Sequence, residues 1–437
     1  MRAAIVGGGI TGMSAADTLS AQGVEVTLYE SEATLGGLAA SFRVDGVLLE
    51  RFYHHLFTSD TAMVDVIERM GLIDRFEWLP TNNSYYAGRT YRLSTPIDLL
   101  RFTRISFFER IRLGILYLRS ASLGDWQPLE NLTAREWLIR QVGENTYRVV
   151  WEPLIRAKFG AYADQISAVW IWNKLKLRGS SRGKGQEERL GYLRGGFGQA
   201  LEAWEAELRR RGVRIELNTP VERVLSADGQ ATGVRTAAGD EAYDQVLVTT
   251  APDVLLSIAP DLPADYRARL GQIDYLANVC LTMQLDRKLS DTYWLNIGVQ
   301  EMPFTGIIEH TNMQRSEIYG GAHLVYISRY LAHTEPSYAK SAEELLDEYL
   351  PHLQTIYPGF ERSWVKNLWD WRARYTQPVI VRNYSQLLPP PETPVRNLWL
   401  ACMAQIYPQD RGMNYAVVSG REAGERILER LGITPAP

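Results

Sequence analysis

Apolar and polar positions at the start of the chain follow the pattern of a strand, a tight turn, a helix and a second strand. Residues 3–6 form a short apolar run, and residues 24–30 alternate between apolar and polar side chains. Between them, Ala15 and Leu19 fall on one face of a helix that ends near Gly23. This order of elements predicts a β-turn-α unit followed by a second strand.

The next part of the chain predicts a change from mixed structure to helices. Residues 60–78 have a helical pattern, and the polar and aromatic residues that alternate over 82–93 indicate a hairpin with a turn at Gly88. Residues 96–155 are predominantly helical in pattern. Residues 174–189 are polar and rich in glycine, so we expect a flexible loop there, either a lid or a disordered connection.

The second half begins with another helix and then turns to strands. Apolar residues recur at helical spacing from Phe197 to Leu208, and Gly212 ends the pattern. A strand at residues 213–217 and three further short strands follow. The last of them, within residues 243–252, ends in two threonines and a proline, and the end of such a strand is where open α/β sheets bind ligands.

The remaining chain predicts a second sheet and a closing helix. Strands dominate from residue 273 to about residue 375, with a helix near residues 341–356. The C-terminal part has a strand at residues 398–401, then a loop and a long helix. We expect the strand-rich region to form an antiparallel sheet in a second domain.

A chain of 437 residues is too long for one ordinary core, and its pattern predicts two interleaved domains of an α/β protein. A Rossmann-like dinucleotide-binding domain is assembled from discontinuous segments, residues 1–80, 190–255 and 376–437. Residues 81–189 and 256–375 are expected to form an α+β substrate domain with an antiparallel sheet and a helical insertion.

Composition narrows the class of protein. The formal charge of −4 gives no reason to expect a nucleic-acid partner, so a small-molecule substrate is expected. The two cysteines, Cys280 and Cys402, provide neither a disulfide framework nor a metal site, and a reducing compartment follows. Neither a cationic leader nor an apolar run of about 18 residues is present, so we expect a cytoplasmic protein.

Residues 96–120 leave two alternatives open. The segment mixes leucine, isoleucine and phenylalanine with arginine. A basic amphipathic helix is typical of peripheral contact with an anionic membrane surface, and it is also typical of a core-facing helix with a solvated side. The arginines are Arg101, Arg104, Arg110, Arg112 and Arg119.

Gly7, Gly9 and Gly12 provide the motif GxGxxG between the first strand and the first helix. The first glycine permits the sharp turn, the second lets the backbone approach a pyrophosphate, and the third lets the helix pack closely on the strand. Phosphates would rest on the amides at the helix N-terminus. Glu30, at the end of the second strand, is placed to accept hydrogen bonds from a ribose. The alternative is a glycine turn that binds nothing.

Four segments together resemble the superfamily of flavin-dependent amine oxidases, protoporphyrinogen oxidases and phytoene desaturases, which is related to UDP-galactopyranose mutase. They are residues 7–30 with the glycine pair at 36–37, the sequence GGFGQAL at 195–201, the strand within 243–252, and RGMNYAVVSGREAGERI at the C-terminus. The resemblance implies an FAD-binding domain of the GR2 type, with FAD bound non-covalently because neither cysteine lies where a covalent link is expected.

The resemblance also implies which residues hold FAD. The closing helix is expected to direct its N-terminal amides at the flavin ring, where a positive helix end stabilises an anionic reduced flavin. The expected FAD-binding residues are Gly7, Gly9, Ile10, Thr11, Gly12, Glu30, Ser31, Gly36, Gly37, Leu38, Val221, Thr250, Ala251, Pro252, Arg411, Gly412, Met413 and Asn414.

His54, His55 and Tyr407 are the candidate catalytic residues. A neutral imidazole accepts a proton or orients a substrate, and a tyrosine can form an aromatic wall beside the flavin. For each of the three, a purely structural role is the alternative. Candidates for holding an anionic substrate, again with surface or interdomain roles as the alternative, are Arg156, Lys158, Arg372 and Arg374.

Two departures from the resemblance limit the expected activity. Many members have an arginine after the second glycine pair, where this chain has Leu38, and the strand at 278–285 lacks the lysine that amine oxidases often keep. Oxidation of simple amines is therefore not the first expectation.

We expect an FAD-dependent oxidoreductase that takes a hydride from an organic substrate. Alternatives are a mutase-like flavoenzyme that acts on a sugar nucleotide through reduced FAD, and a scaffold without catalysis. The oligomeric state stays open.

Overall fold

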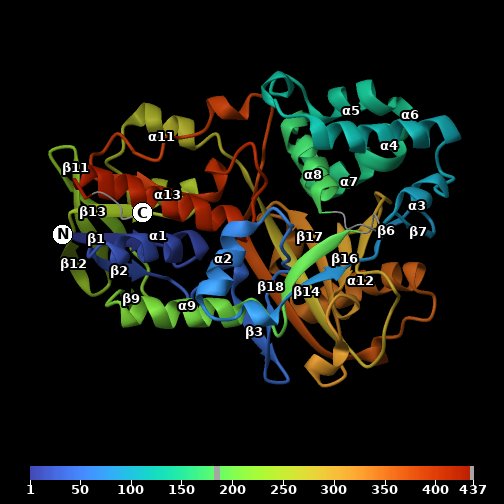
Figure 1. Cartoon of the computed structure of the whole chain (residues 1–437), viewed down its shortest axis with the longest axis horizontal. Helices are drawn as coiled ribbons and strands as arrows, with labels where there is room; N and C mark the ends of the chain where they lie inside the picture. Colours follow the sequence, from blue (N-terminus) through green and yellow to red (C-terminus); the bar gives the residue numbers. More distant parts are fainter. Residues whose placement is uncertain (182–187, 434–437) are drawn as a thin grey trace.

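A computed structural model describes residues 1–181 and 188–433 of the chain. Figure 1 shows a parallel sheet with its helices on the left, a larger sheet at the lower right and a group of helices at the upper right. The parallel sheet has the strand order β19-β13-β1-β2-β9. Its strands are β1 (Arg2–Val6), β2 (Glu25–Tyr29), β9 (Arg214–Glu216), β13 (Gln245–Val248) and β19 (Leu398–Leu400). The expected α/β class is thereby confirmed.

Two helices from opposite ends of the chain pack together beside the parallel sheet. They are α1 (Ile10–Ala21) and α13 (Met413–Arg430), which lie next to each other in Figure 1. Close packing depends on Gly420 of α13, because a Cβ atom there would lie 2.2 Å from the backbone oxygen of Thr11. The N-terminal ends of both helices point to the same region of the molecule as a result.

Further helices and strands pack near the parallel sheet. Helix α9 (Gly198–Arg210) contacts β4 (Val47–Glu50), which forms a hairpin with β3 (Ser41–Val44). A separate three-stranded antiparallel sheet and two short helices lie in the same part of the molecule. They are β10 (Arg223–Ala227), β11 (Gln230–Thr236), β12 (Gly239–Ala242), α10 (Pro252–Ile258) and α11 (Ala264–Leu270).

The larger sheet has seven strands in the order β18-β14-β17-β16-β15-β6-β7. Five of its six strand pairs are antiparallel, as expected, and one pair, β15 with β6, is parallel, so the sheet is mixed. Helix α12 (Ala342–Ile356) packs on it. The strands are β6 (Asn83–Tyr86), β7 (Thr90–Arg92), β14 (Tyr275–Leu285), β15 (Trp294–Ile297), β16 (Gly306–Glu309), β17 (His323–Leu331) and β18 (Val365–Pro378).

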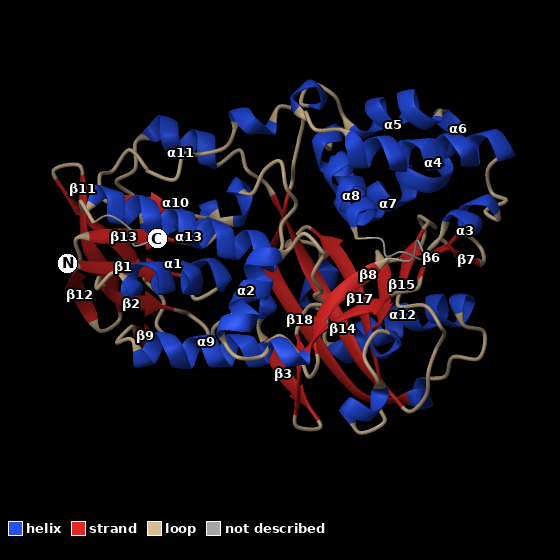
Figure 2. Cartoon of the chain, in the orientation of Figure 1, coloured by secondary structure: helices blue, strands red, loops and turns tan. Residues whose placement is uncertain are grey.

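The expected helical insertion is present and contains six α-helices within the described residues. Hydroxyl side chains cap four of them, and three of these caps are reciprocal, as in Ser106, whose side chain accepts from the Glu109 amide while Glu109 accepts from the Ser106 amide. Figure 2 shows this group as the helices at the upper right. The helices are α3 (Pro96–Leu100), α4 (Phe107–Ser122), α5 (Ala134–Val142), α6 (Glu144–Thr146), α7 (Glu152–Phe159) and α8 (Ala168–Ser180).

Two segments differ from the sequence prediction. The helix expected over 60–78 ends early: α2 spans Thr61–Arg69, and Gly71 follows with a φ of +73°. Residues 76–80 instead form β5 (Phe76–Pro80), which pairs with β8 (Arg189–Leu193). The loop expected over 174–189 is helical up to Ser180, and its remainder at 182–187 lies outside the described residues.

The residue boundaries of the two domains stay a prediction. Strands of the parallel sheet come from residues 2–29, 214–248 and 398–400, whereas the seven-stranded sheet uses strands between residues 83 and 378. Over the part of the chain that the structure describes, no helix combines the length and the apolar character that crossing a membrane requires.

Candidate active site

The GxGxxG turn forms an open cradle at the end of β1. Gly7 has a φ of +111°, and its amide donates to the Tyr29 carbonyl oxygen at 2.9 Å. A Cβ atom on Gly12 would lie 2.0 Å from the Gly7 oxygen, so only glycine lets α1 approach the strand. A Cβ atom on Gly9 would meet nothing within 4 Å. The space above Gly9 is therefore free for a ligand.

The second glycine pair lies beside the first turn. The Gly36 amide donates to the Gly8 oxygen at 2.8 Å, and both Gly36 and Gly37 have positive φ angles, +108° and +55°. A Cβ atom on Gly37 would lie 3.3 Å from the Gly9 Cα atom. The pair therefore lies along the same cradle. The positive φ angles and the close contact with Gly9 explain why both residues are glycines.

Glu30 is buried at the end of β2 and holds the cradle in place. One carboxylate oxygen accepts from the Gly8 amide at 2.7 Å, and the other accepts from the Ser31 hydroxyl at 3.1 Å and the Glu32 amide at 2.9 Å. A carboxylate offers about four acceptor positions, so one position remains for a ligand hydroxyl.

The strand β13 brings a third segment to the cradle. The Thr249 hydroxyl donates to the Gly7 oxygen at 2.9 Å. The Thr250 hydroxyl is buried and finds no hydrogen-bond partner among the described residues. A buried hydroxyl without a partner is costly, which favours a ligand at this position. Ala251 and Pro252 begin α10 next to it, while Val221 is buried in the apolar core beside the sheet.

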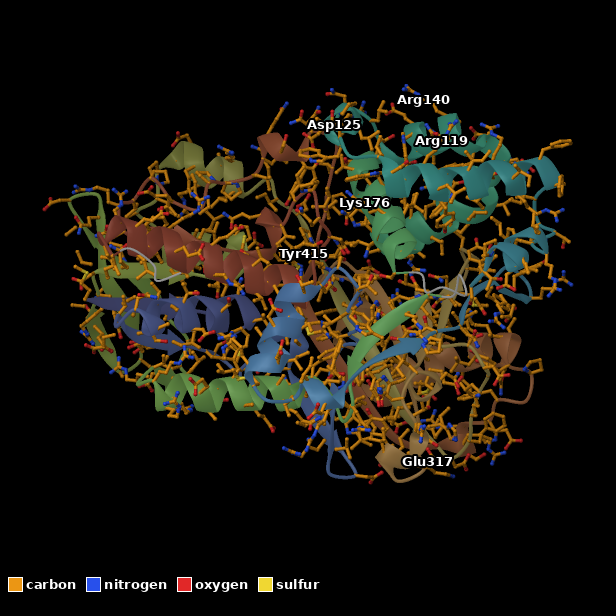
Figure 3. All side chains as sticks on the ribbon, in the orientation of Figure 1. Arg119, Asp125, Arg140, Lys176, Glu317 and Tyr415 are labelled. Carbon is orange, nitrogen blue, oxygen red and sulfur yellow. The ribbon has the colours of Figure 1, made fainter. Side chains whose placement is uncertain are left out.

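A cavity of about 340 Å³ lies between the start of α13, the seven-stranded sheet and the helical insertion. Leu38 and the start of α13 line one side of it. Figure 3 labels Tyr415 near the end of α13 that faces the insertion, and Tyr415 is another lining residue. Aromatic side chains make much of the remaining wall, namely Phe52, Tyr53, Phe57, Tyr85, Tyr117, Trp151, Trp170, Trp294 and Tyr330.

Both candidate histidines line this cavity. The Nδ1 atom of His54 lies 2.6 Å from the Phe52 carbonyl oxygen, which can only accept, so Nδ1 carries the proton and Nε2 is free to accept one. Burial, together with the charge of Arg411, lowers the pKa of His54 to about 4. Burial also lowers the pKa of His55 to about 3, and Arg178 adds to the effect. Both imidazoles are therefore neutral at neutral pH.

Asp410 and Arg411 lie just before the start of α13, and neighbouring residues hold both side chains in place. The Arg411 guanidinium donates to the Tyr330 hydroxyl at 2.7 Å and to the Gln377 side-chain oxygen at 3.0 Å. Asp410 accepts from the Trp170 indole at 3.2 Å and forms an ion pair with Lys174. Burial alone would raise the pKa of Asp410, but the positive charges of Lys174, Lys158 and Arg411 lower it to about 2.

The cavity has an excess of cationic groups. Its described lining contains two carboxyl side chains, Asp60 and Asp410, and four cationic ones, Lys158, Lys174, Arg178 and Arg411. Lys174 is paired with Asp410. Among the described residues, no ion pair within 4.0 Å is recorded for Lys158 or for Arg178. An anionic ligand would supply the missing partner.

Lys158 is held by aromatic rings. Its ammonium group lies 4.9 Å from the ring centre of Trp170 and 5.0 Å from that of Tyr330. Burial, with the nearby charge of Lys174 as a second cause, lowers the pKa of Lys158 well below its usual value. A bound anion would raise it again by stabilising the charged form.

Other candidates lie outside the cavity lining. The Tyr407 ring packs 5.1 Å from the Trp126 ring, and its hydroxyl donates to Glu130, which favours its structural alternative. The Asn414 side chain accepts from the Met63 amide at 3.2 Å and so ties α13 to α2. Arg156, Arg372 and Arg374 form ion pairs with neighbouring carboxylates, as expected of surface or interdomain charges.

The structure adds residues that the sequence analysis did not single out. Asn278 of β14 lines the cavity; its amide nitrogen donates to Ser328 at 2.9 Å, and its buried side-chain oxygen finds no donor within the described residues. An amide side chain between apolar neighbours in a mainly apolar strand is the signal that points to it. Lys174 and Arg178 are four residues apart on α8 and so share one face. Lys174 and Arg178 are polar because they line the cavity, and they belong to a helix instead of the expected loop.

A glycine cradle at the carboxyl end of a parallel sheet, joined to a cavity with neutral histidines and unpaired cations, defines the class of dinucleotide-binding α/β enzymes. Comparison with known proteins narrows the class. Residues 10–428 match the family of flavin-containing amine oxidoreductases. The chain belongs to this family, and the predicted resemblance is confirmed.

Individual relatives fall on several branches. The chain is 26% identical over 299 residues to coproporphyrinogen III oxidase of Staphylococcus aureus. This alignment covers 60% of this chain and 63% of the relative. It is 25% identical over 319 residues to 15-cis-phytoene desaturase of Synechococcus elongatus, covering 67% of each. The fold is similar to that of reduced UDP-galactopyranose mutase, with a TM-score of 0.77 at 16% identity over 98% of this chain and 96% of the other.

The matched part spans less than two thirds of the length of the coproporphyrinogen III oxidase relative. The structural match at 16% identity concerns the fold alone. Family and fold are therefore established, and the substrate has to be inferred from the site itself.

Proposed function

We propose that this protein binds FAD non-covalently and takes a hydride from an anionic organic substrate. The observation that carries the proposal is the cavity that has Gly412 and Met413 on one side and the unpaired cations Lys158 and Arg178 on another. The first pair lies at the start of a helix and the second pair has the charge to hold an anion.

The cradle fits the adenosine and pyrophosphate parts of FAD. The free space above Gly9 would take the pyrophosphate, the remaining acceptor position of Glu30 would take a ribose hydroxyl, and the Thr250 hydroxyl would gain its missing partner. Bound FAD would supply hydride acceptance at its ring. Gly412 at the N-cap of α13 has no side chain, so the first amides of the helix are open to a negative ring.

The cavity side chains would orient the substrate and receive its proton. Lys158 and Arg178 would bind the anionic group, and Arg411 is held rigid by Tyr330 and Gln377 at the helix start. His54 presents a neutral Nε2 that can accept a proton during oxidation. The aromatic wall would exclude water from the reacting atoms.

Non-covalent attachment is supported by the state of the cysteines. Cys280 and Cys402 are both buried, and neither belongs to the lining of the cavity. Burial raises the pKa of the Cys402 thiol to about 12 and that of Cys280 further still, which leaves little thiolate for a covalent link.

A mutase-like reaction on a sugar nucleotide is the second candidate. The same cations, Lys158 and Arg178, would suit a diphosphate, and the fold is similar to UDP-galactopyranose mutase. A scaffold without FAD is the third candidate, and the free space above Gly9 and the unpaired Thr250 hydroxyl speak against it.

The visible absorption spectrum of the purified protein tests the proposal. We expect flavin bands, and we expect the flavin to stay in solution when the protein is precipitated with acid. Under anaerobic conditions, bleaching by carboxylate-bearing or other anionic substrates without NADPH would support hydride removal. Bleaching by NADPH followed by isomerisation of a sugar nucleotide would support the mutase. A protein that neither contains nor takes up FAD would contradict both.

A further inference from the structure

Large apolar side chains are exposed on one part of the molecule. Of the ten that are exposed in the described chain, eight lie between residues 97 and 123, in and around α3 and α4. Phe108 is 79% exposed and Leu118 is 75% exposed. We call these eight residues the docking face: Ile97, Leu100, Phe107, Phe108, Ile111, Ile115, Leu118 and Leu123.

Helix α4 has two separate apolar faces. Leu113 and Leu116 are buried against the rest of the helical insertion. Phe108, Ile111, Ile115 and Leu118 are spaced by three and four residues, so they line up on another face that is exposed to solvent. A helix that only packs on its own protein needs one apolar face. The second face therefore needs a partner.

Five arginines belong to the same segment of the chain as the docking face. Among the described residues, no carboxylate forms an ion pair within 4.0 Å with the arginines of this segment, which are Arg101, Arg104, Arg110, Arg112 and Arg119. The two acids of the segment, Asp98 and Glu109, are used as helix caps. Figure 3 labels Arg119 and Arg140 in this upper right part of the molecule. The guanidinium groups of Arg110 and Arg112 donate to backbone carbonyl oxygens, among them those of Ile105 and Gln141. The segment thus combines exposed apolar side chains with positive charge that no described carboxylate neutralises.

We propose that the docking face binds the surface of an anionic lipid bilayer. The apolar side chains would enter the boundary between headgroups and acyl chains, and the arginines would contact the anionic headgroups. Charge complementarity selects this partner, because a second copy of the chain would bring the same five arginines against these arginines.

The position of the docking face gives it a functional consequence. Tyr117 of α4 and Leu93, just before α3, line the cavity that holds the candidate site. The helix that would lie on the bilayer is therefore also a wall of the cavity. Resting on the proposed function, this arrangement suits a substrate that is both apolar and anionic and that reaches the cavity from the membrane surface.

Vesicle co-sedimentation of the full chain tests the docking independently of the reaction. We expect wild-type protein to sediment with vesicles of phosphatidylcholine and phosphatidylglycerol, and to bind vesicles of phosphatidylcholine alone much more weakly. Raised salt should weaken binding. The flavin spectrum of the same sample shows separately whether the proposed function holds, so loss of one result does not imply loss of the other.

Matched variants separate the apolar and charged contributions. Phe108→Ser with Leu118→Ser should weaken binding by about tenfold or more, because two large side chains no longer enter the bilayer. Arg104→Gln and Arg119→Gln should each weaken binding to the anionic vesicles about fivefold. The control is Ile73→Ser, which removes an exposed apolar side chain outside the docking face and should change nothing. Circular dichroism checks that each variant is folded.

Three results would overturn the proposal. The first is a wild-type protein that binds neither vesicle composition. The second is a Phe108→Ser, Leu118→Ser variant that binds as well as the Ile73→Ser control. The third is a dimer of the wild type in sedimentation velocity that the same double variant dissociates, since the face would then be an interface between copies.

Discussion

At the scale of single residues, Gly9 differs from the other two glycines of the motif, because the fold does not require a glycine at its position. Gly7 and Gly12 are needed by the fold itself, since one has a positive φ and the other packs against the Gly7 oxygen. Gly9 has a φ of −69° and free space where a Cβ atom would stand. The fold itself therefore does not require glycine at this position, whereas a pyrophosphate bound there would.

The first prediction concerns Gly9→Ala. The free energy of unfolding of FAD-free protein should fall by no more than about 1 kcal/mol, the usual range for a change at an N-cap. FAD affinity should fall at least about tenfold, because the new methyl group occupies the pyrophosphate position. Urea unfolding and FAD titration measure the two effects. Gly124→Ala, also with free space around its Cβ position, is the control, and equal FAD affinity in both variants would refute the prediction.

Lys158 and Arg156 provide a matched pair for the anion site. With benzoate as a probe that perturbs the flavin spectrum, Lys158→Met should raise Kd about tenfold, because an interaction with a charged partner is lost. Arg156→Met should change Kd by less than about twofold, because Arg156 is paired with Glu152 and Asp164 outside the cavity. Similar changes in both variants would argue against a specific role for Lys158.

The buried Glu50 predicts a pH dependence of stability. Burial raises its pKa to about 7, although the Tyr192 hydroxyl and the Phe197 amide donate to it. A raised carboxyl pKa gives stability that is present at low pH and is lost as pH rises toward and through the folded pKa. Relative to Glu50→Gln, wild type should therefore lose roughly 3 kcal/mol between about pH 4.5 and pH 8. Urea unfolding across this range measures it, and a constant difference would contradict it.

At the scale of elements, the contact between α1 and α13 determines the position of the candidate flavin site. Gly420 allows the two helices to touch at the Thr11 backbone. Because α13 begins at Met413, the same contact sets where its first amides lie. A helix pair joined over almost the whole length of the chain thus positions residues 411–413.

The corresponding prediction compares two helical glycines. Gly420→Ala should lower the free energy of unfolding by about 2 kcal/mol, since backbone atoms of α1 have to move. Gly114→Ala in α4 meets only ordinary contact at 3.7 Å and should raise stability by about 0.5 kcal/mol through helix propensity. Urea unfolding of both variants tests this, and equal signs would show that the α1–α13 contact is not tight.

At the scale of the whole molecule, FAD is expected to link the distant segments of the chain. The cradle takes residues from β1, from the loop after β2 and from the end of β13, and each segment would gain a contact from the same ligand. Ligand binding to the folded state alone stabilises it by mass action.

The matching prediction is a stability gain with FAD. At a free FAD concentration of about 100 times Kd, the free energy of unfolding should rise by about 2.7 kcal/mol. Gly9→Ala, with a Kd at least about ten times higher, should gain no more than about 1.4 kcal/mol at the same FAD concentration. Urea unfolding with and without FAD measures the difference, and an equal gain in both proteins would mean that FAD does not bind at the cradle.

The sequence by itself determined the local elements and the family. The glycine motif, the alternating strand and the closing helix depend on short-range sterics and periodicity, so they can be predicted from neighbouring residues. The backbone geometry of the glycine turns followed for the same reason at Gly7, Gly12 and Gly36. The helix over 60–78 was predicted too long because pairing between β5 and β8, more than 100 residues apart, outweighs the local pattern.

Only the tertiary structure decided which polar residues meet in the cavity. Lys174 and Arg178 look like loop residues in sequence, but the fold turns their face of α8 toward His55 and Asp410. Tyr407 is close in sequence to Arg411, yet its hydroxyl is bonded to Glu130 and its ring lies outside the cavity lining. Contacts between segments distant in the chain depend on how the helical insertion packs against both sheets, and no local pattern encodes that packing.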